Sequence, residues 1–156
     1  MTSDATSLRC AQCGAAHSPG AECEACFHAL LAYEYERPVA FGAVHHLTVA
    51  AYYLQHPAGY KTEALDFWRE LIAESLDGLV TPRDLLKRAS QRFGGATRTR
   101  EEGATPPVWW PNEWPMTVQS VLRPEESPTV EEYIARARKW ASATRATLDK
   151  CNGRSM

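Results

Sequence analysis

The chain has 156 residues, of which 44% are hydrophobic and 23% are charged, so a packed core is feasible and wholesale disorder is excluded. Its formal net charge of -2 and the lack of any apolar run of about 18 residues exclude a strongly basic protein and a membrane span. The first nine residues contain no apolar stretch typical of a secretory signal, so we expect a cytoplasmic protein.

Residues 1–9 are polar, and we expect a disordered tail. They lead into a cysteine cluster over residues 10–26, with the spacing Cys10-x2-Cys13-x9-Cys23-x2-Cys26. In a reducing compartment, paired CxxC motifs are more often metal ligands than disulfides, and the βαβ context of a redox pair is absent. Two close pairs of thiolates favour Zn²⁺ over an iron–sulfur cluster. Four thiolates would complete a tetrahedral site, which predicts a structural rather than a catalytic metal.

The first predicted helix covers residues 22–36, because its apolar residues recur at helical spacing, and Pro38 ends it. The second covers residues 40–56 and stops at Pro57. It is apolar nearly all round, as expected of the most buried helix in a bundle.

The third predicted helix covers residues 62–77, with Gly78 as the residue that ends it. The fourth opens with Thr81-Pro82-Arg83-Asp84, a capping box with proline at the first helical position, and ends at Gly94-Gly95.

Residues 96–128 contain three tryptophans flanked by prolines and show no convincing helical pattern. Three tryptophans offer too much apolar surface for a free linker, so we expect this segment to be draped over the helices. Within it, residues 116–122 could form a short strand or extended piece. The last helix is predicted over residues 129–148, with a capping box at its start, and residues 151–156 form a tail.

His45 and His56 are eleven residues apart in the second predicted helix, about three turns or roughly 16 Å, so they point the same way. If the first two helices form an antiparallel hairpin, His56 comes near Cys23 and competes with Cys26 as the fourth metal ligand. His45 then comes near Glu34. We expect a buried structural pair whose carboxylate fixes the imidazole tautomer, with an acid–base or second metal site as the functional alternative.

The second half of the chain is basic, with 13 Lys and Arg against nine Asp and Glu over residues 81–156. Six of these cations fall within residues 83–100, where they could follow a phosphate backbone. A solvated face that meets the acidic N-terminal half is the more common outcome for such a run. Nucleic-acid binding is therefore a third function class, behind the two given below.

Several motifs occur together along the chain: CxxCG at residues 10–14, a cysteine ahead of F-x-x-L-L-A-x-E-Y at residues 27–35, V-H-x-L-T-V…Q-H-P at residues 44–57 and W-P-M-T-V at residues 114–118. In these motifs the chain resembles an uncharacterised bacterial family of small cysteine- and histidine-containing proteins, a domain of unknown function. The resemblance implies no activity. It implies the ligand set Cys10, Cys13, Cys23 and His56, because the family pattern often has an apolar residue at Cys26. Since this chain has a well-placed thiol there, we rank Cys26 just ahead of His56.

The sequence thus predicts an all-α bundle of four or five helices over residues 10–150, with an N-terminal zinc-knuckle-like loop. The leading function class is a zinc-stabilised, non-enzymatic binding or adaptor module for a protein or small molecule. The alternative is a metal-dependent enzyme that uses His45, Glu34 and His56.

Overall fold

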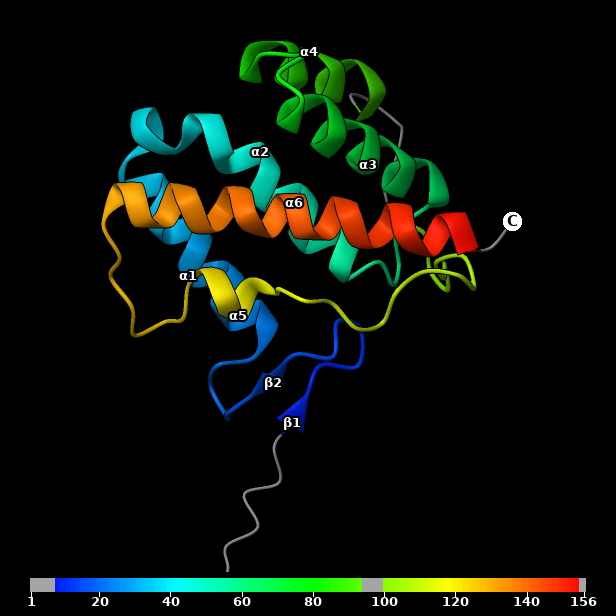
Figure 1. Cartoon of the computed structure of the whole chain (residues 1–156), viewed down its shortest axis with the longest axis horizontal. Helices are drawn as coiled ribbons and strands as arrows, with labels where there is room; N and C mark the ends of the chain where they lie inside the picture. The colour runs from blue at the N-terminus through cyan, green and yellow to red at the C-terminus, as the bar shows by residue number, and fades with distance from the viewer. Residues whose placement is uncertain (1–7, 94–99, 155–156) are drawn as a thin grey trace, which may run out of the picture.

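The computed structural model describes residues 8–93 and 100–154, and the chain forms a bundle of helices with a two-stranded sheet at one end (Figure 1). The elements are β1 (Leu8–Arg9), β2 (Ala16–His17), α1 (Cys23–Glu36), α2 (Pro38–Gln55), α3 (Thr62–Leu76), α4 (Pro82–Phe93), α5 (Val118–Val121) and α6 (Val130–Arg154). This architecture confirms the all-α fold class. Within the described ranges, no helix combines the length and the apolar character that crossing a bilayer requires.

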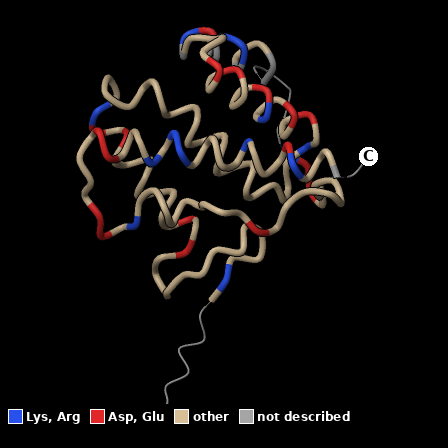
Figure 2. The backbone as a smooth tube through the Cα atoms, in the orientation of Figure 1, with Lys and Arg blue, Asp and Glu red and all other residues tan. Residues whose placement is uncertain are grey.

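Helix α2 is the centre of the bundle and packs against α1, α3, α4 and α6. It contains no Asp, Glu, Lys or Arg, whereas charges of both signs lie along α3, α4 and α6 (Figure 2). Phe41, Val44 and Leu54 of α2 are each 1% exposed or less. Helix α6 runs across α2 in Figure 1 and adds Tyr133 and Trp140, which are both fully buried. The prediction that the second helix is the most buried is consistent with this packing.

The helix starts follow the predicted capping chemistry. Before α4, the Asp84 amide donates to Thr81 Oγ1 and the Thr81 amide donates to the Asp84 carboxylate, each over 3.2 Å. Before α6, the Glu132 amide donates to Thr129 Oγ1 over 3.2 Å and the Thr129 amide to the Glu132 carboxylate over 3.0 Å. Each box satisfies backbone donors that have no partner within the helix.

The tryptophan-rich segment lies against the C-terminal end of α2. The buried Trp110 indole donates to the Leu54 carbonyl over 2.9 Å, and the Gln55 amide donates to the Met116 carbonyl over 2.8 Å. The expectation of a short strand within residues 116–122 is wrong, because Val118–Val121 form helix α5. Thr117 and Ser120 cap this single turn through reciprocal hydrogen bonds. Four residues are too few to show a helical pattern in the sequence.

Two other expected boundaries also need correction. Leu8 and Arg9, placed in a disordered tail, pair with His17 and Ala16 as strands of a hairpin. At the other end, α6 continues to Arg154, so Cys151 belongs to a helix and not to a tail. The prediction for residues 1–7 lies outside the described residues, as do those for Gly94, Gly95 and residues 96–99.

Candidate metal centre

Three cysteines and one histidine meet between the N-terminal hairpin and the adjacent ends of α1 and α2. They are Cys10, Cys13, Cys23 and His56, and their ligand atoms all lie within 4.8 Å of one another. In a tetrahedral zinc site with bonds of about 2.3 Å, two thiolates would be about 3.8 Å apart. The group is therefore close enough to hold one metal ion with small side-chain adjustments.

The turn between β1 and β2 positions the first two cysteines. The Cys10 amide donates to the Ala15 carbonyl and the Gly14 amide donates to the Cys10 carbonyl, both over 2.9 Å. Gly14 has φ of +76°, and a Cβ atom built there would lie 3.0 Å from the Asn112 carbonyl oxygen. Glycine is required because it alone adopts this backbone at low cost and permits the close approach of the tryptophan-rich segment.

Cys13 and Cys23 form the buried half of the group. Their side chains are 1% and 5% exposed, and their Sγ atoms are 3.5 Å apart, well beyond a disulfide bond of about 2.05 Å. The hydrogen bond from Cys23 lowers the pKa of the Cys13 thiol, although burial opposes this effect. The same hydrogen bond, together with burial, raises the pKa of Cys23. The two sulfurs are thus within hydrogen-bond distance of each other, at a place where a cation would stabilise both thiolates.

His56 caps the C-terminal end of α2 and has one nitrogen available to a ligand. Its Nδ1 donates to the Tyr52 carbonyl over 2.8 Å, and its ring stacks on the Tyr52 ring with centroids 4.2 Å apart. The buried Nε2 lacks a hydrogen-bond partner among the described residues. A backbone carbonyl that accepts from one imidazole nitrogen fixes the tautomer and orients the other nitrogen, the usual arrangement for a metal-binding histidine.

Cys26 lies outside this group, which reverses the expected order of Cys26 and His56 as fourth ligand. The Cys26 thiol is fully buried but donates to the Ala21 carbonyl over 3.5 Å, in the loop before α1. Burial raises its pKa, which favours the neutral thiol. Although positions three apart share a helix face, the Cys26 thiol contacts the loop before α1 and is not among the grouped ligand atoms.

Two glutamines form hydrogen bonds with the loops beside the candidate centre. Neither was among the predicted site residues. Gln12 lies between the first two cysteines, and its Oε1 accepts from the Ala58 amide over 2.9 Å, which ties the turn to the loop after α2. Gln119 of α5 donates to the Ala21 carbonyl over 2.5 Å. The position of Gln12 inside the CxxC motif was the only sequence signal for either role.

The predicted contact between His45 and Glu34 is present at a second location, about three turns along α2 from His56. His45 Nδ1 lies 2.6 Å from Glu34 Oε2. The expected burial of the pair is found for Glu34, whose side chain is 4% exposed, but not for His45, whose side chain is 47% exposed. The structure therefore does not bring His45 and Glu34 together with His56 in a single site.

The basic residues of the fourth helix and its exit do not form one continuous stripe in the described part of the chain. Arg83 and Lys87 are exposed, whereas Arg88 pairs with Glu74 of α3. Arg100 donates to the Tyr60 hydroxyl over 2.8 Å and lies over the Tyr60 ring. The side chains of Arg92 and Arg98 lie outside the described residues.

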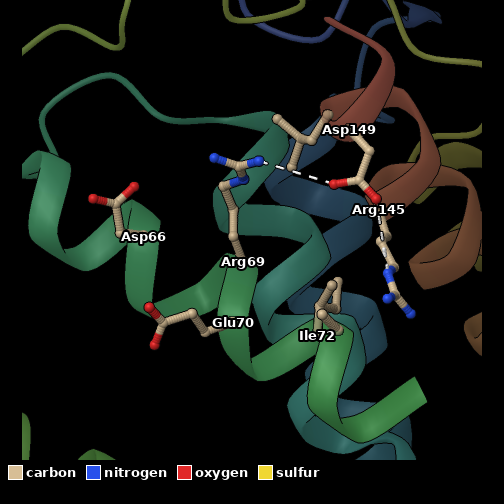
Figure 3. Close-up of a pocket in the computed structure, with 8 residues that line it drawn as sticks. Asp66, Arg69, Glu70, Ile72, Arg145 and Asp149 are labelled. Carbon is tan, nitrogen blue, oxygen red and sulfur yellow. Dashed lines mark ion pairs between the residues drawn. The ribbon is translucent and has the colours of Figure 1, made fainter. Parts of the chain in front are cut away.

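A hollow of 310 Å³ lies between α3 and α6 and is lined mainly by charged side chains (Figure 3). Arg69 Nη2 and Arg145 Nε each lie 3.9 Å from an Asp149 carboxylate oxygen. Arg145 also binds Asp77 through two nitrogens, over 2.7 and 3.0 Å. The Arg69–Asp149 and Arg145–Asp77 pairs connect α6 to α3 and to its C-terminal cap, so this hollow is part of the packing between the two helices.

Comparison with known proteins supplies a family but no activity. No curated protein matches the chain, and no solved structure matches it. One family model matches residues 8–149, a range that contains the four residues of the metal centre, the His45–Glu34 pair and most of α6. The chain belongs to that family, which is described as a family of unknown function (DUF5946).

Proposed function

We propose that Cys10, Cys13, Cys23 and His56 bind one Zn²⁺ ion, and that the protein is a zinc-stabilised helical binding module. The observation that supports this most directly is the convergence of three sulfurs and the unpartnered His56 Nε2 within 4.8 Å. Thiolate and imidazole together are the donor set that zinc prefers in tetrahedral sites. Four protein ligands leave no open coordination position, so the ion has a structural role.

The role of the ion is to join the N-terminal hairpin to the helical bundle. Two ligands come from the hairpin turn, one from the first residue of α1 and one from the end of α2. The hairpin has only two residues in each strand, too few to be stable in isolation. Binding of the metal to the folded state only would stabilise this end of the molecule by mass action.

The test is metal analysis of the purified, reduced protein and of three variants. We expect one zinc per chain in the wild type and in Cys26→Ser, and well below one in Cys23→Ser and His56→Ala. Cys26→Ser is the matched control, since it removes a buried thiol three residues from a ligand. A metal-free wild-type protein contradicts the proposal, as does loss of zinc in Cys26→Ser with retention in His56→Ala.

The enzyme alternative has less support from the geometry. A catalytic zinc needs an open coordination position, whereas this group supplies four ligands. His45 is engaged with Glu34 elsewhere on α2. A second metal ion per chain in the same analysis, lost in His45→Ala, would favour the enzyme over the module.

The nucleic-acid alternative has its own test. Salt-sensitive binding to duplex DNA or RNA that is lost in Arg88→Glu/Arg92→Glu would favour it, because phosphate contacts release counterions. We expect no such binding, since Arg88 is already paired with Glu74.

A further inference from the structure

A second pocket lies where α1 ends and α2 begins, away from the metal centre. It has a volume of 460 Å³, within the range of about 300–1,000 Å³ typical of small-molecule sites. Its walls are mostly apolar and include Leu31, Pro38 and Phe41, with the ring of Tyr35 at its edge, 86% exposed. The polar side chains that line it are Glu34, His45 and His46.

Protein groups contact both oxygens of the Glu34 carboxylate. Thr48 Oγ1 donates to Oε1 over 2.8 Å, and the Tyr133 hydroxyl of α6 donates to the same oxygen. The other oxygen, Oε2, accepts from His45 Nδ1 over 2.6 Å. Glu34 is therefore a buried carboxylate whose three partners come from α2 and α6, and it offers little acceptor capacity to a ligand.

His45 is the polar group that this arrangement presents to the pocket. With Nδ1 committed to Glu34, Nε2 remains for a ligand, on a side chain that is 47% exposed. The hydrogen bond to Glu34 raises the pKa of His45 and so favours the imidazolium, whose Nε2 is a donor. Beside it, burial lowers the pKa of His46 and favours its neutral form. The pocket thus combines apolar walls with one oriented cationic donor.

From this geometry we propose that the pocket binds a small molecule with an apolar body and a single carboxylate, which accepts a hydrogen bond from His45 Nε2. The apolar body packs against Leu31, Pro38 and Phe41. A cationic ligand is disfavoured because the nearest carboxylate, Glu34, is buried and already accepts on both oxygens, and the exposed group in front of it is His45, whose protonated form this contact favours. This inference goes beyond the proposed function and does not depend on the metal ion.

The experiment compares three probes that share a benzene ring and differ in charge: benzoate, benzamide and benzamidine. Binding to the purified full-length chain is measured by ¹H–¹⁵N NMR titration. Benzoate should bind most tightly, shift the amides of α1 and α2 around the pocket, and lose about tenfold or more in affinity in His45→Gln, since a hydrogen bond to a charged group contributes about 1.5–3 kcal/mol. His28→Gln is the matched control, because His28 is an exposed histidine of α1, and it should leave the affinity unchanged.

If His45→Gln does not fold, the pH dependence of benzoate binding to the wild type tests the same proposal. Benzoate affinity should fall as pH rises through the His45 pKa, whereas benzamide affinity should stay constant. The titratable groups that face His45 are Glu34 of α1, His46 of α2 and, through Glu34, Tyr133 of α6. No benzoate binding at millimolar concentration, tighter binding of benzamidine, or pH-independent benzoate binding would overturn the proposal.

Discussion

At the residue scale, the proposed metal centre involves Gly14, which follows Cys13 directly in the turn between β1 and β2. Its φ of +76° and the 3.0 Å approach of the Asn112 carbonyl leave no room for a side chain. Gly20, in the loop between β2 and α1, offers a comparison, because its φ is +84° but nothing lies within 4 Å of its Cβ position.

Gly14→Ala should therefore destabilise the hairpin more than Gly20→Ala does. Both substitutions carry the left-handed backbone cost of about 1–2 kcal/mol, and only the first adds a clash with backbone. Competition with a chromophoric chelator measures zinc affinity in each variant. Equal affinities in the two variants would show that the contact with Asn112 does not shape the site.

The His45–Glu34 pair makes a pH-dependent contribution to stability with a definite sign. Because the hydrogen bond to Glu34 raises the pKa of His45 in the folded state, the contribution is complete below the unfolded pKa of about 6.5. It is lost as pH rises through the higher folded-state value. The gap in Tm between the wild type and His45→Gln should therefore be largest in mild acid and shrink toward alkaline pH. A direct check is an NMR titration of the His45 ring, whose pKa should fall in Glu34→Gln; a wild-type pKa at or below 6.5 contradicts this account.

At the element scale, the Glu34 carboxylate joins α1 to both α2 and α6. Tyr133, in the first turns of α6, is fully buried, and burial together with the nearby Glu34 charge raises its pKa. Its hydroxyl is one of three donors to this carboxylate. The packing of α6 onto α1 therefore includes a polar contact that a purely apolar interface would lack.

Tyr133→Phe should lower the free energy of unfolding by about 1–3 kcal/mol, because it leaves a buried carboxylate with one donor fewer. Tyr33→Phe is the control. Its hydroxyl donates to the Pro128 carbonyl from a half-buried position, so its loss should cost less. Urea unfolding of both variants gives the comparison, and a Tyr133→Phe protein as stable as the wild type would contradict the importance of this contact.

The helices were largely predictable from the sequence because their boundaries are marked by local chemistry. Pro82 starts a helix and the boxes at Thr81 and Thr129 form as expected, whereas α2 begins at Pro38 and not at residue 40. Helix α5 was not predictable, since a single turn has too few residues for a periodic pattern. The two-residue strand β1 was missed for the same reason.

The candidate site was predictable only in part. The CxxC spacing selected Cys10, Cys13, Cys23 and Cys26, and an antiparallel pairing of the first two helices predicted that His56 lies near Cys23. The choice between His56 and Cys26 was not accessible to spacing arguments. It depends on which way the Cys26 side chain turns at the start of α1, and on the Tyr52 carbonyl that orients the His56 ring.

At the scale of the whole molecule, the two candidate sites lie about three turns apart along α2. The candidate metal centre contains three thiols and one imidazole beside the hairpin. The other site is the apolar pocket that His45 lines. Helix α2 contains no Asp or Glu, so each site takes its anionic groups from the hairpin or from α1. Chelation should therefore loosen the hairpin, seen as faster amide exchange at Cys10 and Gly14, while the amides around His45 stay protected.

The central claim is that one ion binds three sulfurs and one imidazole nitrogen. X-ray absorption spectroscopy of the purified zinc-containing protein tests this directly, because sulfur and nitrogen ligands differ in bond length. The account predicts three Zn–S distances of about 2.3 Å and one Zn–N distance of about 2.0–2.1 Å. A first shell of four sulfurs, which would place Cys26 in the site instead of His56, would contradict it.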